Sequence, residues 1–216
     1  MANRIYPRTK IDEHEHLIQP LRVHSLLSDF ELEDVWRVPV NLASTHSLQL
    51  FMDQFAKTNA KLVNRGMTGL LFRIRFFMGR LLKWDEKLLQ DQLIPGSIRF
   101  RYAQQENLAY DDLPHPGSGS FIPVYKLENE FLSEIENSTV QGALHLSRVP
   151  SGQDTWTIHM AVYVKPKGWL GRSYMRLITP FRLWIVYPAL MNAARKHWEA
   201  YLKATAPVDS SARRVI

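Results

Sequence analysis

Residues 124–165 decide the fold and read VYKLENEFLSEIENSTVQGALHLSRVPSGQDTWTIHMAVYVK. Apolar and polar side chains alternate along three runs, at residues 124–136, 140–148 and 155–165. Such alternation is typical of strands that bury one face. Turn-forming residues separate the runs, at Asn137-Ser138 and around Gly152. The stretch therefore predicts a three-stranded antiparallel meander.

The register of this meander follows from its turns. A two-residue turn at Asn137-Ser138 pairs Glu130 with His145, and the second hairpin pairs His145 with His159. One face then carries apolar side chains, namely Phe131, Ile135, Val140, Leu144, Leu146, Trp156, Ile158, Met160 and Val162. The other face is polar and carries Glu128, Glu130, Glu134, Glu136, Gln141, His145, Ser147, Thr157, His159 and Tyr163.

Three residues of the polar face form a cross-strand row of ionisable groups: Glu130, His145 and His159. Such a group can orient a metal ion, move a proton or respond to pH. The alternative is a row that faces solvent or a second copy in a homodimer, with the glutamate paired to imidazole. Both interpretations stay open.

The apolar face needs a helical cover, and the sequence after the meander supplies one. Residues 172–204 have a helical pattern, interrupted near Pro180 and Pro188. We expect this segment to roof the sheet and to leave an enclosed space beneath it.

The rest of the chain is assigned from local pattern. Residues 1–30, with Pro7 and Pro20, predict an irregular or partly ordered arm. Five segments follow: a strand at 31–40, a short helix at 47–57, an amphipathic helix at 67–83, a strand at 97–103 and a loop at 104–120.

Composition excludes several classes of protein. The chain has 216 residues and no cysteine, so disulfides and cysteine-ligated metals are absent and a reducing cytoplasm is expected. The net charge of +6 comes from dispersed basic residues, so we do not expect a nucleic-acid partner. The most apolar window, residues 177–191, is too short for a transmembrane segment. Transient contact with an anionic membrane surface stays open, because residues 169–184 are rich in tryptophan.

Three stretches carry a family resemblance: LLFRIRFFMGRLLKWDEK at residues 70–87, EIENSTVQGALHL at 134–146, and KPKGWLGRSYMRLITPFRLWIVYPALM at 165–191. Together they resemble a bacterial family of uncharacterised domains, related to the START-like or SRPBCC helix-grip superfamily. The resemblance implies an α+β fold in which a curved antiparallel sheet wraps around a long C-terminal helix, with two shorter helices after the first strand. It also implies an apolar cavity that in relatives holds lipids, sterols or polyketides. The expected organisation is an arm at 1–30, one helix-grip domain at 31–205 and a flexible tail at 206–216.

Four residues interrupt or border apolar stripes and are candidate ligand contacts: Trp36, Arg73, Tyr174 and Arg182. The favoured function is binding of a hydrophobic or amphipathic small molecule between the sheet and the C-terminal helix. A cyclase- or dehydratase-type enzyme that uses His, Tyr or Glu remains a second hypothesis, and a structural or interaction protein with a filled cavity a third. No catalytic or cofactor motif is present, and we expect no cofactor and no metal at His14 and His16.

Overall fold

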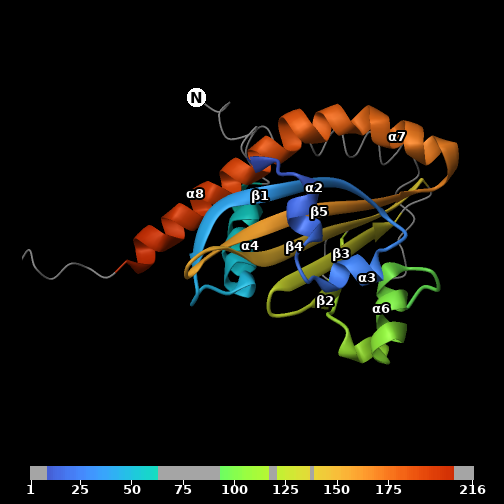
Figure 1. The fold of residues 1–216 in the computed structure, drawn as a ribbon, viewed down its shortest axis with the longest axis horizontal. Helices are drawn as coiled ribbons and strands as arrows, with labels where there is room; N and C mark the ends of the chain where they lie inside the picture. The colour runs from blue at the N-terminus through green and yellow to red at the C-terminus, as the bar shows by residue number, and fades with distance from the viewer. Residues whose placement is uncertain (1–8, 63–92, 117–120, 137–138, 207–216) are drawn as a thin grey trace, which may run out of the picture.

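The computed structural model describes residues 9–62, 93–116, 121–136 and 139–206. Its centre is a curved five-stranded antiparallel sheet in the order β1-β5-β4-β3-β2. The strands are β1 (Glu31–Ala43), β2 (Ile122–Lys126), β3 (Glu130–Glu136), β4 (Val140–Gly152) and β5 (Thr155–Pro166). Helices cover both faces, so the fold is α+β (Figure 1).

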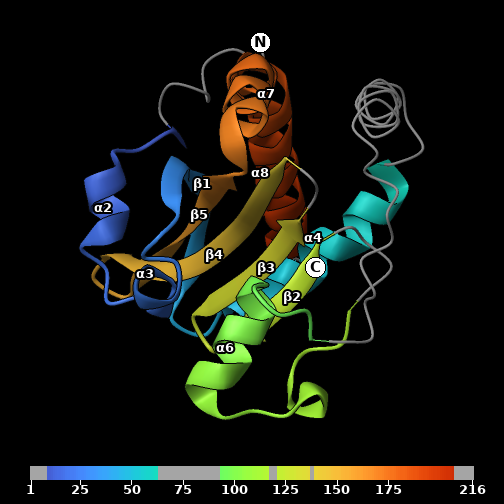
Figure 2. The ribbon, with the colours of Figure 1, turned by 90° about the vertical axis from the view of Figure 1, so that its right-hand side faces the viewer.

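The apolar face of the sheet packs under the C-terminal helix, as the sequence predicts. The cover consists of α4 (Leu48–Leu62) and α8 (Tyr187–Thr205). Trp36 of β1 and Ile158 and Met160 of β5 share one buried cluster with Met191 and Trp198 of α8. Figure 2 shows these helices and α2 on opposite sides of the sheet.

The C-terminal helix reaches α8 through a π-helical turn. Residues Gly168–Phe181 form α7, residues Arg182–Val186 form the π-helix η2, and α8 follows without a break. Pro180 lies inside α7, and Pro188 lies in the first turn of α8. A π-turn is a common way for a helix to absorb a local change in hydrogen bonding, so the two prolines do not end the helix.

The opposite face is covered by helices that the sequence did not reveal. Residues predicted as an irregular arm contain α2 (Glu13–Leu17) and α3 (Arg22–Leu26). Val23 and Leu26 of α3 are fully buried in a cluster with Leu132, Ala161 and other sheet residues. Residues 12–26 thus close over the polar side of the meander.

The predicted strand at residues 97–103 is wrong. These residues belong to α6 (Ile98–Glu106), which Ser97 begins by accepting a hydrogen bond from the amide of Phe100. Ile98 and Tyr102 alternate like strand residues, but they also lie four apart and share one helical face. The Ser97 cap and the following Gln-Gln-Glu decide between the two patterns in favour of the helix.

The predicted strand at residues 124–136 is two strands. A turn at Glu128 and Asn129 separates β2 from β3, with the Leu127 amide donating to the Glu130 carbonyl. The expected loop at 104–120 includes the 3-10 turn η1 (Tyr110–Asp112).

The predicted register is wrong by two residues, although the faces are correct. His145 lies opposite Leu132 and Ala161, while Ser147 lies opposite Glu130 and His159. At the first turn, Glu136 pairs with Gln141, whereas the prediction pairs it with the residue two positions before Gln141. A shift of two preserves which side chains share a face, because side chains alternate with a period of two.

Gly171 allows α7 to pack closely on the sheet. A Cβ at this position would lie 2.2 Å from the carbonyl oxygen of Thr139, far inside van der Waals contact. We expect Gly171→Ala to lower the free energy of unfolding by about 2 kcal/mol or more, because the backbone must move apart. Urea unfolding measures this, with Ser173→Ala on the exposed side of the same helix as control. Equal stability of both variants would contradict the close approach.

Candidate functional site

Ionisable side chains gather on the face of the sheet that α2 and α3 cover. His16 comes from α2, His24 from α3, and His145, His159 and Tyr163 from β4 and β5. His16 and His145 are completely buried, and His159 is 3% exposed. The His16 ring centroid lies 5.5 Å from that of His145 and 5.8 Å from that of His159. Polar residues at this depth are unusual unless they are paired or functional.

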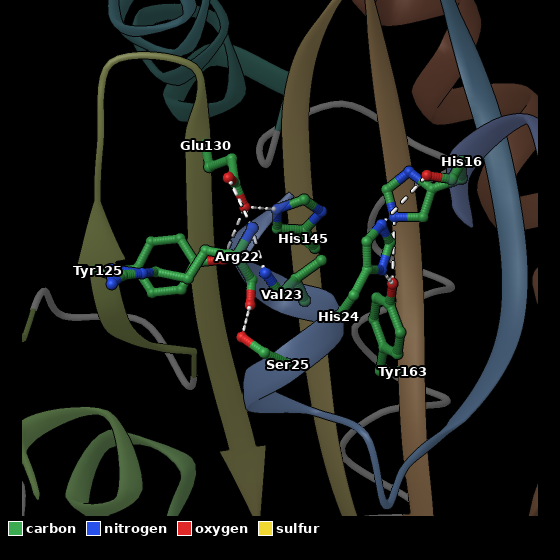
Figure 3. Close-up of polar contacts among 9 residues, drawn as sticks. All are labelled: His16, Arg22, Val23, His24, Ser25, Tyr125, Glu130, His145 and Tyr163. Carbon is green, nitrogen blue, oxygen red and sulfur yellow. Dashed lines mark hydrogen bonds and ion pairs between the residues drawn. The ribbon is translucent and has the colours of Figure 1, made fainter. Parts of the chain in front are cut away.

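Glu130 ties this cluster to the N-terminal helices (Figure 3). Its carboxylate accepts hydrogen bonds from the backbone amides of Arg22 at 2.9 Å and Val23 at 3.4 Å, which begin α3. It also accepts from the Tyr125 hydroxyl and from Nε2 of His145, each at 3.1 Å. A helix start is a favourable place for a carboxylate, so one residue of β3 stabilises the cap of a distant helix.

The pKa of Glu130 reflects a competition. Burial alone would raise it, but the hydrogen bonds from His145 and from the amide of Arg22 hold this pKa below its usual value. Glu130 is therefore ionised at neutral pH. Because a carboxylate only accepts hydrogen bonds, Nε2 of His145 carries the proton in this contact and its Nδ1 does not when the ring is neutral.

Tyr163 links two more histidines. His24 Nε2 donates to the His16 carbonyl oxygen at 3.2 Å, so a neutral His24 offers Nδ1 as an acceptor. The Tyr163 hydroxyl donates to that Nδ1 at 3.3 Å, and its oxygen accepts from His16 Nε2 at 3.1 Å. This series of hydrogen bonds fixes the proton of His16 on Nε2 and leaves its Nδ1 without a proton (Figure 3).

Three imidazole nitrogens in the cluster have no hydrogen-bond partner among the described residues. They are Nδ1 of His16, His145 and His159. Burial, followed by the neighbouring histidines, lowers the pKa of His16 to about 3. Burial and then the Arg37 guanidinium lower the pKa of His159 to about 4. Both rings are neutral at pH 7 and present lone pairs rather than charges.

A second carboxylate of β3 repeats the capping arrangement. Glu134 accepts from the amides of Ile98 at 2.6 Å and Arg99 at 3.3 Å, at the start of α6. Burial nevertheless raises the pKa of Glu134 to about 7. Two glutamates four residues apart on one strand therefore hold the first turns of two different helices.

A cleft of about 430 Å³ opens beside the histidine cluster. One wall is α2 with the residues after it, and the other is formed by β1, β5 and the end of β4. Its lining is polar and apolar in similar measure: Glu15, Ile18, Gln19, Arg37, Asn41, Pro150, Ser151, Thr155, Thr157 and His159. Arg37 and Glu15 form an ion pair across it. His159 is the member of the buried cluster that reaches this cleft.

The structure brings together the predicted row in modified form. Glu130 and His145 are in contact, and His159 lies on the same face, joined to His145 through the ring of His16. The row faces neither solvent nor an exposed surface, because α2 and α3 bury it. The alternative of a solvent-facing row is wrong for this reason, although the pairing of glutamate with imidazole that belonged to it is present.

Two of the four predicted ligand contacts, Trp36 and Arg182, can be placed in the structure, and both lie away from the cleft. Trp36 is fully buried under α8, where its ring centroid is 4.9 Å from that of Tyr187. Arg182, on η2, donates to Asp34 at 2.5 Å and to Glu33 at 3.3 Å. Tyr174 is on α7 and its side chain is outside the described part, as is all of Arg73. Neither Trp36 nor Arg182 lines the cleft.

Sequence reasoning missed His24, Tyr125 and Tyr163 as members of the cluster. A signal for α2 was present in the sequence DEHEH, where Asp12 caps the helix by accepting from the His14 amide at 2.8 Å. Asp followed three residues later by Glu is a typical helix start. Among the described residues, no three His or acidic side chains are arranged to hold a metal ion.

Comparison with known proteins gives one family match. A family model described as "Protein of unknown function (DUF2867)" covers residues 26–189. The chain belongs to this DUF2867 family. No curated protein and no solved structure matches it. The DUF2867 match includes Glu130, His145 and His159, whereas α2 with His16 precedes it.

Proposed function

We propose that this DUF2867 protein binds an amphipathic small molecule in the cleft between α2 and the sheet. The observation that carries the proposal is His159, a buried imidazole that lines the cleft and whose Nδ1 has no partner among the described residues. A buried imidazole whose polar atoms lack partners is costly, and a ligand hydroxyl that hydrogen-bonds to the part of the His159 ring that lines the cleft reduces this cost. The volume of about 430 Å³ is within the usual range of small-molecule sites.

The lining supports an amphipathic ligand that carries hydroxyl groups. Gln19 and Thr157 provide hydrogen-bonding groups, while Ile18 and Pro150 provide apolar surface. Beneath α8, by contrast, Trp36 and Met191 belong to a cluster of buried side chains in mutual contact. We therefore move the expected ligand from the space under the C-terminal helix to the opposite face of the sheet.

We also propose that the fold is of the helix-grip kind. Its support is the order of elements, in which the first strand pairs with the last and the chain ends in a helix across the sheet. The ligand site proposed here does not depend on that assignment.

Native mass spectrometry of protein purified from its own host tests the binding proposal. We expect a co-purifying small molecule in the wild type and its loss in Thr155→Trp, which fills the cleft from an exposed rim position. Gln153→Trp is the matched control, because Gln153 lies in the same hairpin and does not line the cleft. A bare wild-type protein, or equal occupancy in Thr155→Trp, would reject the proposal.

A second candidate function is a general acid–base enzyme of cyclase or dehydratase type. The enclosed pairs His16–Tyr163 and Glu130–His145, next to the cleft, favour it. His159 lines the cleft and is unprotonated at neutral pH, which is the form that a general base requires. If this is correct, the co-purified ligand loses one water during incubation with the wild type and stays intact with His159→Phe. An unchanged ligand in both samples would leave binding as the sole activity.

A further inference from the structure

The helix α7 exposes a row of large apolar side chains on its outer side. Trp169 is 72% exposed, Leu177 73% and Trp184, on η2, 73%. Leu170 and Phe181 are also exposed. These five are half of the exposed large apolar side chains among the described residues, although α7 and η2 form a small part of the chain. A group of large apolar side chains exposed on a protein surface commonly marks a site that binds a partner or a membrane.

The five residues lie on one side of the helix. At 100° per residue, Trp169, Leu177 and Trp184 point in directions that differ by less than a quarter turn. The opposite side of α7 carries Gly171 and Met175, which are both buried, and Met175 packs with Val140 and Val164 of the sheet. Figure 1 shows α7 along an outer edge of the molecule. The apolar stripe therefore faces away from the sheet and the other described elements.

Basic side chains accompany the stripe, and acidic ones are absent from this part of the sequence. Arg172 and Arg176 are exposed on α7, and no ion pair joins either of them to a carboxylate of the described residues. No Asp or Glu occurs between Asp154 and Glu199 in the sequence. The surface thus combines two tryptophans, aliphatic side chains and unpaired arginines.

We propose that α7 docks on an anionic membrane surface. Tryptophan rings favour the boundary between headgroups and acyl chains, and the arginines lie where they meet lipid phosphates. None of the helices in the described ranges has the length and apolarity that a membrane crossing requires, so the helix lies in the interface plane. The proposal is independent of the ligand cleft, which is on another surface of the protein.

Sedimentation with lipid vesicles tests the proposal. We expect the full chain to sediment with vesicles of phosphatidylcholine and phosphatidylserine and to bind pure phosphatidylcholine at least tenfold more weakly. Trp169→Ser with Trp184→Ser is expected to weaken binding about a hundredfold, because two large apolar side chains are lost. Arg172→Gln with Arg176→Gln is expected to weaken it at least tenfold and to reduce its salt dependence.

The control is Leu202→Ser, which removes an exposed apolar side chain from α8 away from the stripe. We expect its binding to equal that of the wild type. Thermal melting checks that each variant is folded. We expect every variant to fold, because the replaced side chains are exposed. No sedimentation of the wild type with the anionic vesicles, or equal binding to both vesicle types, would overturn the proposal. So would a self-associated wild type that becomes monomeric in the double tryptophan variant, since the stripe would then bind a second copy.

Discussion

Replacing Glu130 by alanine is expected to lower the free energy of unfolding by about 3 to 5 kcal/mol, because several buried donors lose a charged hydrogen-bond acceptor. The change removes the acceptor of four donors at once, namely the amides of Arg22 and Val23, the Tyr125 hydroxyl and His145 Nε2. Each donor is then buried or half-buried without a partner. Because two of them begin α3, we expect the N-terminal helices to loosen from the sheet.

Urea unfolding and hydrogen exchange measure the two effects of this substitution. The matched control is Glu136→Ala on the same strand, whose carboxylate pairs with the exposed Lys167. Such a surface pair contributes up to about 1 kcal/mol. Glu130→Gln keeps an oxygen acceptor and is expected to lie between the two alanine variants. If Glu130→Ala unfolds like Glu136→Ala and exchange of the Arg22 and Val23 amides is unchanged, Glu130 does not hold α3.

The second large effect is loss of stability in mild acid. Histidine in the unfolded chain takes up a proton near pH 6.5, whereas folded His16 and His159 do so only at about 3 and about 4. Between these values the unfolded state binds more protons, so stability falls as pH falls. Glu134 acts in the opposite direction between its ordinary 4.5 and about 7, because its protonated form is favoured in the folded protein.

The balance predicts the slope. In this pH range, two histidines bind about two more protons in the unfolded state than in the folded state, and Glu134 binds about one more in the folded state. The lowered pKa of buried His145 adds to the excess of protons in the unfolded state. We expect stability to fall by about 1 to 3 kcal/mol for each pH unit between pH 6 and pH 5. Urea unfolding across this range measures the slope.

His16→Phe isolates one member of the cluster. At pH 8 the variant is expected to be about 1 kcal/mol less stable than the wild type, since the hydrogen bond to Tyr163 is lost. Its slope in acid is expected to be smaller by about 1.4 kcal/mol per pH unit, so the two curves cross. His14→Gln, on the exposed side of the same helix, is the matched control. Parallel curves for His16→Phe and the wild type would show that His16 titrates like a solvated histidine.

Much of the sheet was predictable because its pattern is local. Alternation along residues 140–165 correctly separates the side chains that meet α8 from those that form the histidine cluster. The local pattern gave the wrong prediction at residues 97–103. The apolar residues there fit both the alternation of a strand and the four-residue spacing of a helix. The local pattern also failed at Glu128 and Asn129, where a tight turn interrupts an otherwise continuous strand pattern.

The candidate site was only half predictable, since its second half comes from distant sequence. Glu130 and His145 are fifteen residues apart and share a hairpin, so pairing rules place them on one face. His16 reaches Tyr163 across 147 residues of sequence. The sequences of the short helices α2 and α3 do not indicate which surface of the sheet these helices cover. The burial that lowers the histidine pKa values therefore became visible only in three dimensions.

The helices α2 and α3 bury a cluster of neutral histidines on the polar face of the sheet. Nitrogen-15 NMR of the imidazole rings tests it most directly, because the ring shifts report protonation and tautomer for each histidine. We expect His16 and His145 to be neutral with the proton on Nε2 at pH 7, His16 to remain neutral down to about pH 4, and His159 to remain neutral down to about pH 5. Titration of His16 and His159 near pH 6.5, like exposed histidines, would contradict the account.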